Sequence, residues 1–318
     1  MIWLAWRLQR LGLGLSAGLL ALLAAYMHLT GAGIHAVYPD LSRACAAADS
    51  MACSRLSQAV DAWSLPYLTL FTWLQLVPLG FALLAAVPLL LQLEQGTFRL
   101  VWTQSATRGR WIAAMLGSAL LATVVACAGF DLLASWWLQP LDAVQGGFRP
   151  GIFELEGVVP IAYGVFALAL VVSAGTLLRR SMAAGGVALA GFLVAHFTIA
   201  GWVRPYYLPP TRIDWRIGVP QRGTLIYDRN WLITAGISDG RGPVHAQNSV
   251  ALICPTKFHG ELQMLTACLR QHRWIDNTLI YQLSARFWPF QLIESAIYVG
   301  TAAILLLVAI WRIRTRLT

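Results

Sequence analysis

The sequence has few charged residues for its length. Only 12% of its 318 residues are Asp, Glu, Lys or Arg, whereas 58% are hydrophobic, and the mean hydropathy is +0.63. A soluble domain carries about 25% charged residues, so this chain lacks the charge to cover a water-facing surface of its size. The shortage argues against an ordinary soluble protein and directs attention to the apolar runs.

Lysine is nearly absent, and Lys257 is the only one. The chain contains no G-x-x-x-x-G-K-[ST] phosphate-binding loop, so ATP, if it is used, must be bound by another polypeptide. The motifs C-x-x-C and H-E-x-x-H are also absent. We expect no catalytic site, metal or cofactor in this chain, and the less favoured alternative is a zinc site formed by Cys254, His259, Cys268 and His272.

Six apolar runs are long enough to cross a bilayer, because a spanning helix needs roughly 20 mostly apolar residues. We expect spans at about 11–29, 67–93, 111–137, 158–178, 183–203 and 290–311. Trp111 and Trp136 flank the third run and would lie about 38 Å apart on a helix, near the full thickness of a membrane. The sequence predicts an all-α polytopic membrane protein.

The first ten residues, MIWLAWRLQR, are amphipathic, and we expect an interfacial helix that leads into the first span. The alternative is a cleaved signal peptide, since a basic start precedes an apolar core.

Arginine indicates the orientation. The short segments that we place inside contain Arg7, Arg10, Arg99, Arg108, Arg110, Arg179, Arg180, Arg312, Arg314 and Arg316, whereas those placed outside contain Arg43, Arg55 and Arg149. Cytoplasmic loops carry the excess of positive charge, so we expect both termini to be cytoplasmic. The basic residues lie at span ends, where they meet membrane lipid, and in one long hydrophilic segment. They do not cluster into one patch the size of a groove, and we expect no nucleic-acid partner.

Residues 204–289 form the longest hydrophilic segment, and we expect a small mixed extracytoplasmic domain there. The expected division is 1–203 for the interfacial helix and spans one to five, 204–289 for this domain, and 290–318 for the sixth span and a cytoplasmic tail. Residues 223–236 are typical of a strand, and 258–273 of a helix with Leu262, Leu265 and Leu269 on one face. We interpret the domain as a folded cap and not as a hydrolase.

Four of the five cysteines lie in segments placed outside, and Cys127 lies within an apolar run. We predict disulfides between Cys45 and Cys53 and between Cys254 and Cys268, with cross-links between the two loops as the alternative.

Three ionisable residues lie within spans, where a charge near the bilayer centre costs about 2.5–3.5 kcal/mol. Asp131 and His196 lie at similar depth below the outer interface. They could pair or line a polar pathway, and a structural hydrogen bond or a snorkelled interfacial contact is the favoured alternative. Glu294, near the outer end of the sixth span, is expected within reach of water or of Arg286.

The segment EQGTFRLVWTQSATRGRW, residues 94–111, is polar without being a simple run of charge. Gly96 can end a helix, Thr97 can cap the next one, and Phe98 and Trp102 would lie on one face. A short helix parallel to the bilayer could receive a push from a cytoplasmic partner, although an ordinary connector explains the pattern equally well.

This segment resembles the loop between the second and third spans of ABC type-2 exporter permeases, particularly those of high-GC actinobacteria. WRLQR resembles their N-terminal interfacial helix, and RFWPFQLIES, residues 286–295, resembles their final re-entry segment. The six-span layout, with the largest outside segment between spans five and six, is also similar. The resemblance in architecture covers most of the chain, whereas the specific motifs cover only a small part of it.

The resemblance implies that two permeases, identical or paralogous, assemble with two copies of an ABC ATP-binding subunit that binds ATP and magnesium. Residues 94–110 would dock in the ATPase, and the residues implied in coupling are Glu94, Gly96, Thr97, Phe98, Arg99, Trp102, Thr103, Gln104, Ser105, Arg108 and Arg110. The implied function is that of an ATP-driven exporter's permease in the inner membrane of a bacterium.

Two alternatives remain. A proton-coupled secondary transporter would use Asp131 and His196. A non-transporting envelope protein would use its ectodomain, which is basic and could attract anionic lipid or peptidoglycan.

Overall fold

The computed structural model describes residues 2–47, 49–96, 107–217, 230–240, 242–245, 253–254, 262–274 and 276–316. Within these residues, six helical segments are long and apolar enough to cross a membrane: Gln9–Ala46, Ser50–Gln95, Gly109–Gln145, Val159–Leu178, Ser181–Tyr206 and Ser284–Thr315. A small sheet lies between the fifth and sixth segments in the chain. The prediction of a mostly helical protein with six spans is therefore confirmed.

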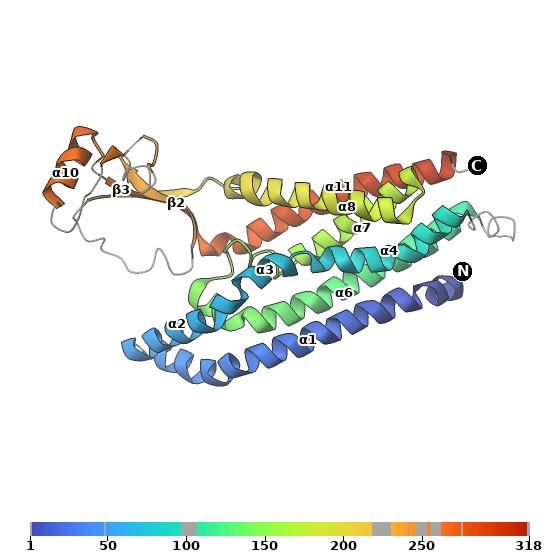
Figure 1. The fold of residues 1–318 in the computed structure, drawn as a ribbon, viewed down its shortest axis with the longest axis horizontal. Helices are drawn as coiled ribbons and strands as arrows, with labels where there is room; N and C mark the ends of the chain where they lie inside the picture. The colour runs from blue at the N-terminus through green and yellow to red at the C-terminus, as the bar shows by residue number, and fades with distance from the viewer. Residues whose placement is uncertain are drawn as a thin grey trace.

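The first helix is longer than predicted. α1 (Ile2–Ala46) is continuous, so the described residues contain no separate interfacial helix before the first span (Figure 1). No proline interrupts the chain near Arg10, where the interfacial helix was expected to meet the first span. A glycine such as Gly12 destabilises a helix by only about 1 kcal/mol relative to alanine, so the helix continues. At 1.5 Å per residue the helix is about 68 Å long, which exceeds the thickness of a bilayer.

The segment between the first two expected spans, which we placed outside, is also largely helical. α1 continues to Ala46, and α2 (Ser50–Ser64) follows after a short turn. The Asp49 carboxylate caps α2 by accepting hydrogen bonds from the backbone N–H groups of Met51 and Ala52, at 2.9 and 3.1 Å. The chain then returns to the membrane through η1 (Leu65–Tyr67), α3 (Leu68–Leu74) and α4 (Val77–Gln95).

The remaining spans pack around α7 (Val159–Leu178), which contacts α4, α6 (Arg108–Gln145), α8 (Ser181–Thr198) and α11 (Phe287–Arg316). Two glycines permit this close packing. A Cβ added at Gly164 would lie 2.4 Å from Cys127 Sγ, and one at Gly175 would lie 2.2 Å from Leu90 Cδ2. Small residues let helices approach closely where lipid supplies no hydrophobic driving force.

Trp111 does not mark the membrane surface, contrary to the prediction. Its side chain is only 1% exposed and packs in the core between α4, α6 and α7. Trp136, the other predicted marker, is 38% exposed. Trp111 belongs to the first turn of α6, and its indole N–H has a partner on α4, so the ring turns inward and not toward lipid.

The sheet has three antiparallel strands in the order β1 (Thr211–Arg216), β3 (Asp276–Gln282), β2 (Trp231–Ser238). β2 begins within the predicted strand segment, whose residues 223–229 lie outside the described part of the chain. α10 (Leu262–Gln271) occupies most of the predicted helix. η2 (Ile199–Val203), η3 (Arg204–Tyr206) and η4 (Ser284–Arg286) connect the sheet to α8 and α11.

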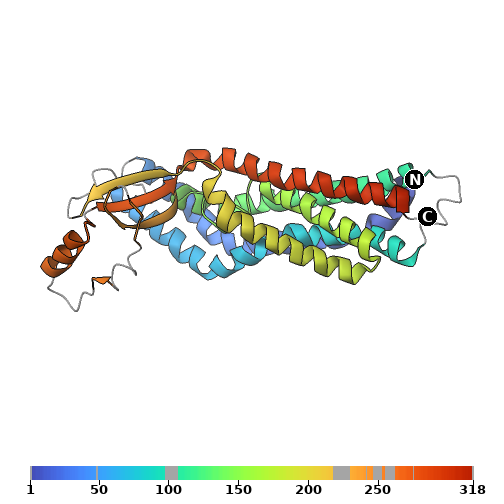
Figure 2. The same ribbon diagram turned by 90° about the horizontal axis from the view of Figure 1, so that it is seen from above.

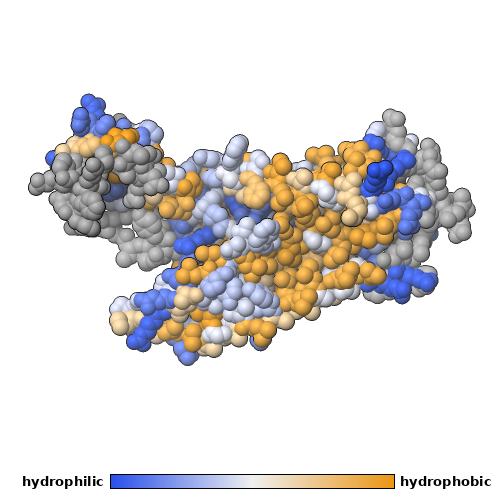
Figure 3. Space-filling model, viewed as in Figure 1, coloured by the Kyte–Doolittle hydropathy of each residue, from blue (hydrophilic) through white to orange (hydrophobic). Residues whose placement is uncertain are grey.

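The two ends of the bundle differ. The start of α1 and the end of α11 lie together at one end, and the sheet extends from the other, as two perpendicular views show (Figures 1 and 2). Apolar side chains cover the middle of the bundle, and hydrophilic residues gather toward both ends (Figure 3). This distribution suits a bundle immersed in a bilayer.

Candidate functional site

The predicted coupling segment connects α4 to α6. The part of the chain that the structure describes leaves out Thr97, Phe98, Arg99, Trp102, Thr103, Gln104 and Ser105, and it includes only the backbone of Arg108. Gly96 follows the last residue of α4 and caps the helix, and its φ of +67° is a left-handed conformation that glycine adopts without strain. α6 begins after Thr107, whose hydroxyl accepts a hydrogen bond from Arg110 N at 3.4 Å.

Two contacts tie the ends of this segment to the bundle. The Glu94 carboxylate accepts hydrogen bonds from the hydroxyl of Ser181 and from its backbone N–H at 3.0 Å, which joins the end of α4 to the start of α8. Trp111 Nε1 donates to Gln92 Oε1 at 3.2 Å, which joins α6 to α4. A displacement of the intervening residues would therefore reach α4, α6 and α8 together.

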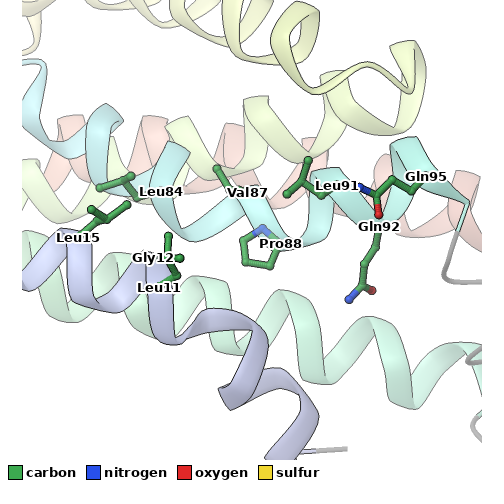
Figure 4. Close-up of a pocket in the computed structure, with 9 residues that line it drawn as sticks. All are labelled: Leu11, Gly12, Leu15, Leu84, Val87, Pro88, Leu91, Gln92 and Gln95. Atoms are coloured by element: carbon green, nitrogen blue, oxygen red, sulfur yellow. The ribbon is translucent and has the colours of Figure 1, made fainter.

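A groove lies between α1 and α4 near the same end of the bundle (Figure 4). Its volume is about 380 Å³, and its walls are mostly apolar. Pro88 has no backbone N–H to donate to Leu84 O, and the close approach of Gly12 brings α1 against that carbonyl. One turn before Gly12 on α1, Gln9 Nε2 donates to Ala85 O at 3.1 Å. α1 thus packs against the α4 carbonyl to which Pro88 cannot donate.

The opposite end contains a buried ionic cluster around Arg204. The guanidinium is 2% exposed and binds Glu294 on α11 through Nε to Oε2 and Nη2 to Oε1, both at 2.7 Å. Its Nη1 donates to Glu154, in the buried turn between α6 and α7. The π-helical turn η2 shifts the helix phase just before Arg204. The cluster joins the end of the fifth span, the start of the sixth and this turn.

Hydroxyl groups and an aromatic ring complete the cluster. Tyr163 on α7 donates to Glu294 Oε1 at 2.6 Å, and Tyr207 donates to Glu294 Oε2 at 3.2 Å. The Arg204 guanidinium carbon lies 4.6 Å from the centroid of Phe153. Burial raises the pKa of Glu154, but the charge and hydrogen bond of Arg204 outweigh it, so the pKa is lowered. Glu154 is therefore ionised in spite of its burial.

Glu294 is not positioned as predicted. It is fully buried and bound to Arg204, whereas Arg286 donates to Pro209 O and to Gln282 Oε1, both at 2.6 Å. Arg286 belongs to η4, one turn before α11 enters the bundle, and so it remains with the sheet. Arg204 replaces it as the partner of Glu294.

Asp131 and His196 make separate contacts. His196 is buried, and its Nε2 lies 2.8 Å from Gln75 Oε1. Asp131 Oδ1 accepts a hydrogen bond from Ser135 at 3.4 Å. These hydrogen bonds connect the two residues to different partners, Ser135 for Asp131 and Gln75 for His196.

A second acidic group lies beside the turn between α6 and α7. Glu156 is 6% exposed and hydrogen bonds to Asp142. Burial raises the pKa of Glu156 to about 11, and the hydrogen bond and negative charge of Asp142 act in the same direction. Glu156 is therefore a neutral carboxylic acid near pH 7.

Both predicted disulfides are present. Cys45 pairs with Cys53, with Cα atoms 4.6 Å apart, and Cys254 pairs with Cys268, with Cα atoms 5.9 Å apart. His272 lies near the second pair, but a sulfur in a disulfide is not a thiolate that could bind zinc. His259, the fourth ligand of the alternative zinc site, lies outside the described residues. Cys127 is buried and free.

The sheet contains one G-x-S-x-G string, residues 236–240, which the sequence analysis missed. Its serine, Ser238, is fully buried at the end of β2. Ser238 Oγ lies 2.6 Å from Thr278 Oγ1 and accepts a hydrogen bond from Arg212 Nη2 at 3.0 Å. A nucleophile elbow exposes its serine between a strand and a helix, so this serine is structural.

Sequence reasoning did not select Arg204, Glu154 or Tyr163. A signal for Glu154 was available, since FELEG places two acids within an apolar segment that is too short to span a membrane. Arg204 was assigned to the ectodomain because it follows the fifth apolar run. Only its burial shows that it belongs to the bundle.

These features define a multi-pass membrane protein whose polar contacts hold helix ends together. The family model "ABC-2 membrane transporter related" matches residues 17–204, and the chain belongs to this family. Membership indicates a transporter permease subunit, which in this family is typically non-catalytic. No curated protein and no solved structure matches the chain.

Proposed function

We propose that the chain is the membrane permease of an ATP-driven exporter. It works with two copies of a separate ABC ATP-binding subunit, which holds ATP and magnesium, and with a second permease, identical or paralogous. Its location is the inner membrane of a bacterium. The observation that carries the proposal is the family match, which spans the first five membrane segments and includes the whole segment between α4 and α6.

The contacts around residues 97–106 support a coupling role. Glu94 bonds to Ser181, and Gln92 bonds to Trp111, so both ends of the segment are attached to neighbouring helices. A force that an ATPase exerts on this segment would therefore be transmitted to α4, α6 and α8 together. Arg110 lies at the start of α6, where a cytoplasmic partner could reach it.

The orientation follows from the charge distribution. The end of the bundle that carries both termini also carries most of the arginines of the short segments, and the positive-inside rule places this end in the cytoplasm. The sheet and both disulfides then lie outside, where thiols are oxidised.

The chain itself performs no covalent step in this mechanism. Its contribution is a different affinity for the substrate in two conformations, whose populations depend on the nucleotide state of the partner. A proton-coupled secondary transporter would instead show transport driven by a proton gradient without ATP.

The proposal is tested by purifying the chain with its candidate ATPase and measuring ATP turnover. We expect Arg99→Glu combined with Arg108→Glu to abolish the stimulation of turnover by assembly, because it reverses two charges in the segment that docks. The control is Arg10→Glu combined with Arg312→Glu, which reverses the same charge on the same side of the membrane, outside that segment. Failure of any ATPase to associate, or equal turnover in both double variants, would contradict the proposal.

A further inference from the structure

A second cavity lies at the sheet end of the bundle. Its volume is about 540 Å³, and three parts of the chain line it: the segment from α2 to α3, the end of α6 with the turn that follows, and the start of β2. Their residues include Leu68, Phe71, Arg149, Ile152 and Leu232. The cavity therefore lies where the sheet meets the membrane helices, away from the ATPase-facing end.

Exposed aromatic residues place this cavity at the level of the lipid headgroups. Trp73, next to the lining residue Thr72, is 65% exposed. Trp202 and Trp288, where the fifth and sixth spans meet the sheet, are 81% and 58% exposed. Tryptophan concentrates at the boundary between hydrocarbon and headgroups, so the cavity faces the outer leaflet's polar layer.

The cavity has one cationic wall. Arg149 lines it, and among the described residues no carboxylate forms an ion pair with its guanidinium. Arg149 Nη1 donates to Gln145 Oε1 at 2.6 Å, and Gln145 Nε2 in turn donates to Asp61 Oδ1 at 2.5 Å. The amide thus orients the guanidinium, and the Asp61 carboxylate bonds to this amide. The positive charge remains available to an anion.

Apolar side chains line much of the rest of the cavity. Leu68 is 55% exposed, Leu232 is 41% exposed, and Phe71 is buried. Leu68 and Thr72 are four residues apart on α3 and therefore share one face of the helix, which descends into the bilayer. The exposed Leu68 side chain gives this face an apolar surface in the same cavity as Arg149.

We propose that this cavity binds an anionic phospholipid of the outer leaflet. Its phosphate bonds to Arg149, and one acyl chain follows the Leu68 face of α3. The planar guanidinium is suited to a phosphate because it can donate two parallel hydrogen bonds. The proposal goes beyond the transport function and does not depend on it, since binding can be measured without a partner ATPase.

The test uses the purified full chain in detergent and native mass spectrometry, with dioctanoyl phosphatidylglycerol as the probe. A hydrogen bond to a charged group contributes about 1.5–3 kcal/mol, so we expect Arg149→Gln to weaken binding of the most tightly held lipid molecule by roughly tenfold or more. Arg149→Lys keeps the charge but loses the two-pronged geometry, and its affinity should lie between those of the native protein and Arg149→Gln. Leu68→Gln should weaken binding of this probe while leaving the folded protein intact.

Arg55→Gln is the matched control, because it removes the same charge on the same side of the membrane and Arg55 does not line the cavity. Lipid held at other arginines contributes equally to both variants, so the difference between their lipid affinities measures the contribution of Arg149. Dioctanoyl phosphatidylcholine should bind more weakly than the anionic lipid, and glycerol phosphate should not bind measurably. Equal affinities of Arg149→Gln and Arg55→Gln, or preference for the zwitterionic lipid, would overturn the proposal.

Discussion

Arg204 and Glu294 form a two-pronged ion pair inside the bundle, with both N–O distances at 2.7 Å. The two side chains are 2% and 0% exposed. Ninety residues separate them in the chain, and the whole sheet lies between. The pair therefore closes the loop that contains the sheet and holds the last span against the others.

Removing Arg204 should destabilise the protein strongly. Arg204→Met leaves Glu294 and Glu154 buried without their cation, and breaking a buried pair in this way costs about 3–5 kcal/mol. Thermal unfolding in detergent measures the effect. The control is Arg43→Met, since Arg43 and its partner Asp40 are each 78% exposed, and an exposed pair contributes little. A melting temperature equal to that of the control would show that the cluster is not structural.

Glu156→Gln should change the pH dependence of stability. The pKa of Glu156 is about 11 in the folded protein against an ordinary value of 4.5, so between these values the folded state binds a proton that the unfolded state has released. The stabilising contribution is complete below pH 4.5 and declines as pH rises toward 11. The variant keeps a neutral side chain and should gain stability relative to the native protein as pH rises.

Melting temperatures between pH 5 and 9 test this prediction. Glu154→Gln, two residues away, provides the contrast, because Arg204 lowers the pKa of Glu154 and its ionised form is the stabilising one. That variant should lose stability at neutral pH. Parallel pH profiles for the native protein and Glu156→Gln would mean that Glu156 is ionised.

The thiol count should report both disulfides. Maleimide labelling of the denatured, unreduced protein should modify one cysteine, Cys127, and labelling after reduction should modify five. In the folded protein Cys127 should react slowly because it is buried. Protein prepared from the membrane under non-reducing conditions is the material for this measurement. A count of three or more before reduction would show that a disulfide is not formed.

Gly164→Ala should separate α7 from α6. The new Cβ would lie 2.4 Å from Cys127 Sγ and 3.0 Å from Thr123 Cγ2, so a helix must shift, at a cost of about 1–3 kcal/mol. Adding Cys127→Ala removes the closer atom and should restore part of the lost stability. Gly117→Ala is the control, since nothing lies within 4 Å of its added Cβ. Equal melting temperatures for Gly164→Ala and Gly117→Ala would contradict the packing.

The six spans and both disulfides could be predicted from the sequence because each depends on local information. A bilayer selects apolar runs by length, and this selection requires no knowledge of neighbours. The pairs Cys45–Cys53 and Cys254–Cys268 close short loops, so the partner of each cysteine lies close to it in the chain. Gly96 could also be recognised locally, since a left-handed residue suits the end of a helix.

The polar contacts were decided only by the tertiary structure. Hydropathy does not distinguish a tryptophan that faces lipid from one that faces a neighbouring helix, and Trp111 makes the second contact. Nor does it choose between Arg204 and Arg286 as the partner of Glu294, because both arginines flank apolar runs. Their difference arises from the direction in which each side chain leaves its helix, which depends on how the fifth and sixth spans pack against α7. The sequence by itself determined which segments enter the membrane, and packing determined which charges could be buried together.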